Sequence, residues 1–314
     1  MKKQIWKRVV IIFVSLFVTY WLLQTVLPPA ILYGSVHRRY DFNDTATPWE
    51  ERTFPDGLTA DKVILDTEDG ERVAMYTLLP EKPKAVILYL TGISGPTVQS
   101  FANQAIELSK QNIGALFLEM RAHGESSGQL IGLGFLEGRD VKAAVSYAEE
   151  TLLIGDTPLI LQGVSMGGAT ALIAGAENEA VDGIIAMSPF VTYGEQFDLA
   201  MKSYFVPPLS RRYVSLLIEK TLKLMYGNEV TDRENPRAKT EALREMPILL
   251  MASKDDRTVS SENTQILSTL LPNASVWVRD GKNHLIVDGN ELENAASDEA
   301  YMTTLNRWLG DLIE

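Results

Sequence analysis

The sequence predicts an α/β protein with a mostly parallel, doubly wound sheet that helices cover on both faces. Short apolar runs alternate with helical patterns from about residue 62 to the C-terminus. An unbroken apolar run such as 85–90 (Ala-Val-Ile-Leu-Tyr-Leu) is typical of a strand that is buried on both faces. The composition, with 46% hydrophobic and 22% charged residues among 314, is that of a globular protein.

The predicted elements follow one another in a regular order. Strands at 62–66 and 72–79 flank an Asp-Gly turn and form a hairpin; further strands are expected at 85–90, 114–118, 158–162, 183–187, 248–252 and 274–279, with helices at 100–111, 136–150, 167–176, 261–271 and 300–313. The long connection between the strands at 183–187 and 248–252 has no strand signal, and its apolar residues have helical spacing at 213–226. We therefore expect a helical cap, inserted between two strands of the sheet.

The N-terminal segment predicts a membrane anchor. Residues 9–27 carry no charge, and a helix of this length spans about 28 Å, close to the hydrocarbon thickness of a bilayer. Pro28 and Pro29 are expected to end this helix. A cleaved signal peptide and a buried core helix are the alternatives, but the run is long for a signal peptide and no Ala-x-Ala site follows. Four basic residues precede it, which favours a cytoplasmic N-terminus and an exported globular domain.

The expected organisation and charge exclude several classes of function. We expect an anchor at 1–30, a linker at 31–60, an α/β core at 61–190 and 246–314, and the cap at 191–245. The net charge of −12 and the lack of a basic face argue against a nucleic-acid partner. The chain has no cysteine, its three histidines are not spaced for zinc, and no glycine-rich phosphate loop occurs. We therefore expect no metal and no other cofactor.

The chemistry is expected to centre on Ser165. Gly163-Val-Ser-Met-Gly167 matches the pattern G-x-S-x-G, in which a nucleophilic serine occupies a sharp turn between a strand and a helix. An apolar strand precedes the motif and an alanine-rich helix follows it, as this pattern requires. A glycine-rich turn whose serine only caps the helix is the alternative.

A serine hydroxyl needs a base, and the base needs an acid that orients it. His37 falls in the linker and His123 precedes the serine, so the chain order serine, acid, histidine selects His284 as the base. The acid is expected on a loop that follows a strand and precedes this histidine. Asp255 and Asp256 are the candidates there.

Three blocks of sequence, in order and at sensible spacing, carry a resemblance to a known family. They are residues 119–126 (Glu-Met-Arg-Ala-His-Gly-Glu-Ser), 163–168 (Gly-Val-Ser-Met-Gly-Gly) and 256–259 (Asp-Arg-Thr-Val). From about residue 63 onward the chain resembles the α/β-hydrolase superfamily, and most closely its serine aminopeptidase and acylglycerol-lipase-like (S33-type) members with a helical cap. The family's D-x-x-V acid loop implies Asp256 as the acid, and its D-x-R-G-H-G-x-S stretch implies that His123 stabilises a loop.

The resemblance also implies an oxyanion hole made by the backbone amides of Ile93 and Met166. The sequence departs from the family at Thr91, where histidine is frequent, and at Glu119 and Ala122, where Asp and Gly are usual. Because the donors of the hole are backbone N–H groups, such side-chain changes need not abolish it.

We therefore expect a serine hydrolase that cleaves an ester or related acyl bond. A peptidase on the same triad is one alternative, because fold and triad do not decide which bond is cut. A non-catalytic binding protein is another, although a degraded triad would be its signature. The expected substrate is a small acyl compound, including lipid-like ones, and apolar acyl groups are favoured because the cap carries several apolar and aromatic side chains: Phe197, Met201, Tyr204, Phe205, Leu216 and Met225.

Overall fold

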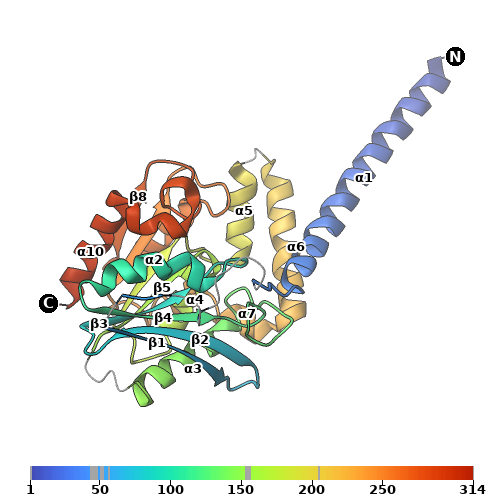
Figure 1. The fold of residues 1–314 in the computed structure, drawn as a ribbon. Helices are drawn as coiled ribbons and strands as arrows, with labels where there is room; N and C mark the ends of the chain where they lie inside the picture. Colours follow the sequence, from blue (N-terminus) through green and yellow to red (C-terminus); the bar gives the residue numbers. More distant parts are fainter. Residues whose placement is uncertain are drawn as a thin grey trace.

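The computed structural model describes residues 2–42, 49, 53–55, 57–152, 157–203 and 206–313. These residues form one eight-stranded sheet in the order β1-β2-β4-β3-β5-β6-β7-β8 (Figure 1). β2 is antiparallel to β1 and to β4, and all other neighbouring strands are parallel. The strands are β1 (Leu58–Asp66), β2 (Arg72–Pro80), β3 (Ala85–Leu90), β4 (Ile113–Glu119), β5 (Leu159–Val164), β6 (Gly183–Met187), β7 (Ile248–Ser253) and β8 (Ser275–Arg279).

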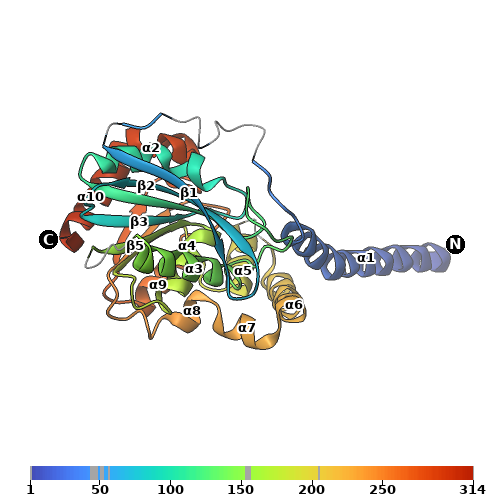
Figure 2. The ribbon, with the colours of Figure 1, turned by 60° about the horizontal axis from the view of Figure 1, so that its bottom comes forward.

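Helices cover both faces of this sheet (Figures 1 and 2). The predicted fold class is therefore confirmed: the chain has the α/β-hydrolase architecture. The helices are α1 (Lys2–Val36), α2 (Thr97–Ser109), α3 (Glu137–Glu150), α4 (Met166–Gly175), α5 (Tyr193–Ser203), α6 (Pro208–Tyr226), α7 (Asn228–Arg233), α8 (Pro236–Lys239), α9 (Glu262–Leu270) and α10 (Glu299–Ile313), with short 3-10 helices η2 (Asp288–Asn290) and η3 (Leu292–Ser297) before α10.

The central strands contribute side chains to two apolar layers, one on each face of the sheet. In β3, Val86 and Leu88 belong to the layer that also contains α3, α4 and α9, whereas Ile87 and Tyr89 belong to the layer with α2 and α10. Every residue of β3 is buried. Because successive side chains of a strand point to opposite faces, a strand that is covered on both sides must be apolar at every position, which explains the unbroken run at 85–90.

Helix α1 extends beyond the end predicted from its prolines. Pro28 and Pro29 lie inside the helix, which continues to Val36. A proline costs a helix one backbone hydrogen bond and a steric clash. Here the turns after the prolines are packed against the rest of the protein: Leu32 and Val36 are 4% and 0% exposed, and Ile131 N donates to the Val36 carbonyl over 2.9 Å. Tertiary packing thus outweighs the local preference to stop.

The N-terminal half of α1 is exposed along its length. The helix is long and apolar enough to cross a membrane, and none of its most apolar window is buried against the rest of the protein. It projects away from the globular part (Figure 1). A buried core helix, one of the alternatives drawn from the sequence, does not describe this segment, which is a candidate membrane span.

The segment between β6 and β7 is helical and includes α5 to α8. Helix α6 covers the predicted helical stretch at 213–226 and begins earlier, at Pro208. Phe197, Met201 and Met225 are partly buried against the apolar core, whereas Leu216 is 50% exposed. Tyr204 and Phe205 fall outside the described residues.

A buried ion pair joins the β1–β2 hairpin to α3. Arg121, 4% exposed, donates to both carboxylate oxygens of fully buried Asp140, over 2.7 Å from NH2 to Oδ1, and to Asp69 over 2.7 Å. Arg139 reaches the same Asp69 from the surface, over 2.9 Å, with 36% of its side chain exposed. Two arginines thus bind one aspartate in different surroundings.

Replacement of these two arginines should separate the buried from the exposed ion pair. Arg121→Ala removes the guanidinium that pairs with buried Asp140, which should lower the free energy of unfolding by about 3–5 kcal/mol. Arg139→Ala removes an exposed pair and should cost about 1 kcal/mol or less. Urea unfolding of both variants in detergent measures the difference, and equal losses would contradict it.

Candidate active site

Ser165 occupies a strained turn between β5 and α4. Its backbone angles are φ 55° and ψ −118°, outside the regions that a residue with a side chain ordinarily adopts. The turn is possible because the residues two positions before and after Ser165 are glycines: a Cβ on Gly163 would lie 2.1 Å from the Gly167 carbonyl oxygen, and one on Gly167 would lie 2.4 Å from the Leu90 carbonyl oxygen. The Ser165 amide donates to the Met187 carbonyl of β6 over 2.8 Å, which holds the turn against the sheet.

Asp256 and His284 form a hydrogen-bonded pair. His284 Nδ1 lies 2.7 Å from Asp256 Oδ2, and the two side chains are 17% and 1% exposed. The other carboxylate oxygen, Oδ1, accepts the backbone amides of Thr258 at 2.7 Å and Val259 at 3.2 Å. The D-x-x-V spacing therefore lets the loop orient its own aspartate, whereas the neighbouring Asp255 is exposed.

Two hydrogen bonds connect this pair to the serine turn. Ser188, the residue after β6, donates its hydroxyl to the His284 carbonyl over 2.7 Å, and its neighbour Met187 accepts the Ser165 amide. The turn, the acid loop and the histidine loop follow β5, β7 and β8, three parallel strands whose carboxyl ends meet at one edge. Among the described residues there is no hydrogen bond between Ser165 Oγ and His284 Nε2. Such bonds commonly tighten only when substrate is bound.

The loop after β3 lies against the candidate nucleophile. A Cβ on Gly92 would be 3.5 Å from the Ser165 Cβ. The next residue, Ile93, is held through its carbonyl, which lies 2.9 Å from Nε2 of His123, a fully buried side chain. Met166 is the first residue of α4, so its amide has no partner within the helix. The residues expected to supply the oxyanion hole thus flank Ser165, and His123 supports one of them.

The turn that carries His123 accommodates the two departures from the family pattern. Ala122 stands in the left-handed region at φ 61°, which explains why glycine is usual there. Glu119 Oε2 accepts the Glu125 amide over 2.7 Å and lies so close to Gly124 that a Cβ there would be 2.1 Å away. Burial raises the pKa of the Glu119 carboxyl to about 7. Glu119, although one methylene longer than the aspartate usual at this position, therefore still binds the backbone of this turn.

Residues from the predicted linker also hold this turn. Tyr40 exchanges two backbone hydrogen bonds with it, from its amide to the Ala122 carbonyl over 2.9 Å and from the Gly124 amide to its own carbonyl over 2.8 Å. Arg39 donates to the carbonyls of Gly124 and Ser126. His37, in contrast, is exposed and stacks on Tyr33 of its own helix. Nothing in the local sequence signals that the chain after α1 supports the active-site loops.

The cap is tied to the acid loop through two polar residues that sequence reasoning missed. Gln196 of α5 donates to the Thr258 carbonyl, and Asn263 of α9 donates to Gln196 Oε1 over 2.8 Å. Asn263 Oδ1 also accepts the Val191 amide over 3.2 Å. Both residues are buried. Polar residues at helical positions are usually solvated, so only the packed structure reveals this role.

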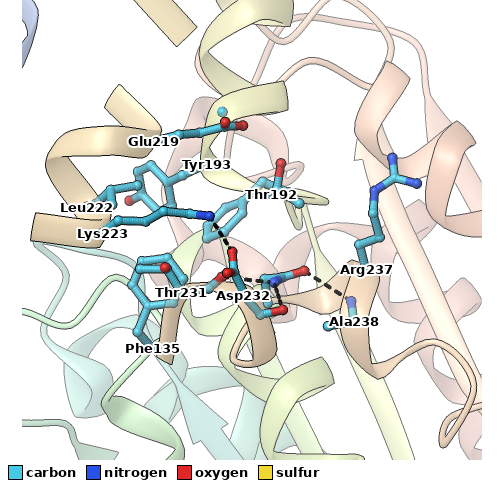
Figure 3. Close-up of a pocket in the computed structure, with 13 residues that line it drawn as sticks. Phe135, Thr192, Tyr193, Glu219, Leu222, Lys223, Thr231, Asp232, Arg237 and Ala238 are labelled. Atoms are coloured by element: carbon cyan, nitrogen blue, oxygen red, sulfur yellow. Dashed lines mark hydrogen bonds and ion pairs between the residues drawn. The ribbon is translucent and has the colours of Figure 1, made fainter. Parts of the chain in front are cut away.

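A cavity of about 270 Å³ lies between the cap helices and the core (Figure 3). Its lining includes Phe135, Tyr193 and Leu222, and the Lys223–Asp232 ion pair at 2.7 Å. Among the described residues, neither Ser165 nor the apolar cap side chains Phe197, Met201, Leu216 and Met225 line it. Within the described part of the chain, no three histidine or acidic side chains are grouped so that they could hold a metal ion.

Comparison with known proteins assigns the chain to a family. The family model for serine aminopeptidase, S33, matches residues 81–238, and the chain belongs to this family of hydrolases. The match includes the Ser165 turn and most of the cap, whereas Asp256 and His284 lie beyond it.

Similar solved structures share the fold at low sequence identity. An esterase of Pyrococcus furiosus is 18% identical with a TM-score of 0.66, covering 89% of this chain and 99% of its own. The esterase domain of a Rhodothermus marinus protein is 18% identical with a TM-score of 0.55, covering 82% and 100%. An acylaminoacyl peptidase of Pyrococcus horikoshii is 12% identical with a TM-score of 0.59, covering 82% of this chain and 43% of its own.

Glu119 should make stability fall as the pH rises. Its pKa is about 7 in the folded protein against an ordinary 4.5, so between these values the folded state binds more protons than the unfolded state. The stability contributed by the protonated carboxyl is present at pH 5 and lost by pH 8, about 2–3 kcal/mol at most. Glu119→Gln should therefore become more stable relative to the wild type across this range. Urea unfolding at pH 5 and pH 8 tests this, with Glu107→Gln, whose side chain is 42% exposed, as the control; parallel pH profiles for all three proteins would refute it.

Proposed function

We propose that this protein is a membrane-anchored serine hydrolase that cleaves an ester or related acyl bond through a Ser165–His284–Asp256 triad. The observation that carries the proposal is the 2.7 Å hydrogen bond between His284 Nδ1 and buried Asp256, at the same sheet edge as the strained Ser165 turn. An ordinary surface histidine is not expected to bond a buried carboxylate that two backbone amides hold in a fixed orientation.

The proposed reaction has two half-steps. Ser165 Oγ attacks the acyl carbonyl while His284 Nε2 takes its proton, and the histidine then delivers that proton to the leaving group. Asp256 accepts the Nδ1 hydrogen, which leaves Nε2 free as the base and stabilises the charged ring. The amides of Ile93 and Met166 would stabilise the tetrahedral oxyanion. Water then releases the acyl group from Ser165 by the same proton transfers in reverse.

The anchor is proposed to be α1, with its N-terminus in the cytoplasm and the hydrolase domain exported. Support comes from the length and exposure of the helix and from the basic residues before its apolar run. Retention rather than cleavage is favoured by the hydrogen bonds of Tyr20 and Thr25 with helix α6, which cleavage near residue 30 would remove. Protein isolated from membranes should begin at residue 1 and resist extraction by carbonate. A mature N-terminus near residue 30 would show a signal peptide instead.

A peptidase is the second candidate, and the family itself favours it, because the matching model describes serine aminopeptidases. Two of the similar structures are esterases and one is an acylaminoacyl peptidase. We place the ester first because the cap carries apolar side chains and no strongly charged face. A panel of p-nitrophenyl esters, monoacylglycerols and aminoacyl amides separates the two, since a clear preference for the amides would reverse the order.

Ser165→Ala should abolish hydrolysis without unfolding the protein. Alanine removes the attacking oxygen but leaves the turn, and loss of a triad nucleophile lowers turnover by on the order of 10⁶. Labelling by a fluorophosphonate probe should disappear at the same time. A variant that kept a tenth of the wild-type rate would exclude Ser165 as the nucleophile, and a wild-type protein that failed to label would favour a non-catalytic role.

The two neighbouring aspartates provide a matched pair of variants. Asp256→Asn should lower kcat by about 10⁴, because an amide cannot hold His284 in the tautomer that leaves Nε2 free. Asp255→Asn should have little effect, because this side chain is exposed and outside the pair. Steady-state kinetics on the best ester tests both, and comparable losses would overturn the assignment.

A further inference from the structure

Helix α1 does not leave the domain at its C-terminal end; it runs beside the cap helix α6 (Figures 1 and 2). Tyr20 OH lies 2.8 Å from Ser210 Oγ, and Thr25 Oγ1 lies 2.7 Å from Tyr213 OH. The rings of Trp21 and Tyr213 meet edge to face with centroids 5.1 Å apart. Because the later residue of α1 meets the later residue of α6, the two helices run in the same direction. The N-terminal end of α6 therefore points along α1 toward its exposed, apolar half.

The contacts fix how deep the cap reaches if α1 spans a bilayer. Tyr20 lies seven residues before Leu27, the last residue before the two prolines, which is about 10 Å along a helix. If the hydrocarbon boundary is at Leu27, the first turn of α6 lies about 10 Å inside it. If the boundary is instead at the aromatic pair Tyr20 and Trp21, the first turn of α6 lies at that boundary. Both placements bring the residues before Ser210 into contact with lipid.

The chemistry of this end of the cap suits an apolar solvent. Pro207, Pro208 and Leu209 are exposed, with Leu209 71% exposed, and Val206 is partly exposed. No charged residue occurs in the sequence between Lys202 and Arg211. Exposed leucine and proline without neighbouring charge are poorly solvated by water and are accommodated at the boundary of acyl chains and headgroups.

The charged residues on either side mark where the apolar surface ends. Lys202 is paired with Glu262 over 2.8 Å, and Arg211 with Asp198 over 3.5 Å. These two ion pairs hold the Lys202 and Arg211 side chains against neighbouring helices rather than at the end of the cap. The uncharged end of the cap is thus the part that faces the membrane half of α1.

We propose that residues 206–209, the tip of the cap, insert into the bilayer that holds α1. The inference rests on the proposed membrane anchor. Its consequence is that lipid contacts a cap whose helix α5 also holds the acid loop, through the hydrogen bond from Gln196 to the Thr258 carbonyl. The hydrolase domain is then attached to the membrane at two points, α1 and the cap tip, with the cap between the lipid and the candidate active site.

The chain has no cysteine, so single cysteines can carry a fluorescent label in the full-length protein. Three exposed positions are compared: Leu209→Cys at the tip, Val14→Cys in the apolar half of α1, and Leu224→Cys near the other end of α6, about 22 Å from Leu209. The labelled proteins are placed in phosphatidylcholine vesicles with or without lipids that carry a doxyl quencher on the acyl chain. Thermal unfolding confirms that each variant is folded.

Quenching at positions 209 and 14, with little at position 224, is the expected result. Quenching at 14 but not at 209 would overturn the insertion of the cap tip while leaving the anchor intact. Absence of quenching at 14 would overturn the anchor itself, and the inference with it. Equal quenching at 209 and 224 would show that all of α6 lies on the membrane rather than its tip alone, and would also overturn the proposal.

Discussion

The backbone of Ser165 is the constraint on which the rest of the candidate site depends. A residue at φ 55° and ψ −118° costs on the order of 1–3 kcal/mol, so the surrounding structure must hold it there. The buried strands β5 and β6 do so through the bond from the Ser165 amide to the Met187 carbonyl, and the glycines on both sides let α4 approach β3 and β5. Any partner of the serine hydroxyl must then come from loops at the same edge of the sheet.

These loops are supported by groups that lie far from them in the sequence. His123 holds the carbonyl of Ile93, and the turn that carries His123 is held in its place by Arg39 and Tyr40. Ser188 fixes the backbone of His284. The candidate oxyanion loop and the candidate base are thus positioned by hydrogen bonds to backbone carbonyls, which tolerate changes of nearby side chains. This explains why Thr91, Glu119 and Ala122 can depart from the family pattern without loss of the geometry.

Helix α1 belongs to the folded domain as well as to the proposed anchor. Its last turns fill core positions, and its middle binds α6 through hydroxyl pairs and an aromatic contact. A hydrolase domain that began at Val36 would lack Leu32 and would expose the apolar surface that Leu32 covers. The proposed membrane segment, the cap and the candidate acid loop are therefore connected through packed contacts, so the activity of the protein is best measured with the full chain in lipid or detergent.

The sequence by itself determined the elements of the core and the candidate chemical groups. The strands were located from two patterns: alternating apolar and polar residues, which indicate burial on one face, and unbroken apolar runs, which indicate burial on both faces. The glycines around Ser165 and the Asp-Arg-Thr-Val stretch at Asp256 mark local backbone geometry, so they can be recognised within a few residues. The backbone amides of Thr258 and Val259 bond the aspartate that the family resemblance implied.

Only the tertiary structure decided the features that depend on distant contacts. The continuation of α1 through Pro28 and Pro29 follows from the burial of Leu32 and Val36, which no local propensity contains. The roles of Arg39 and Ser188 depend on which carbonyls lie opposite them in the folded chain, and isolated polar residues carry no periodic signal. For the same reason the sequence predicted a helical cap but not the direction in which its helices run relative to α1. The pairing of Tyr20 with Ser210 turns the tip of the cap toward the apolar half of α1.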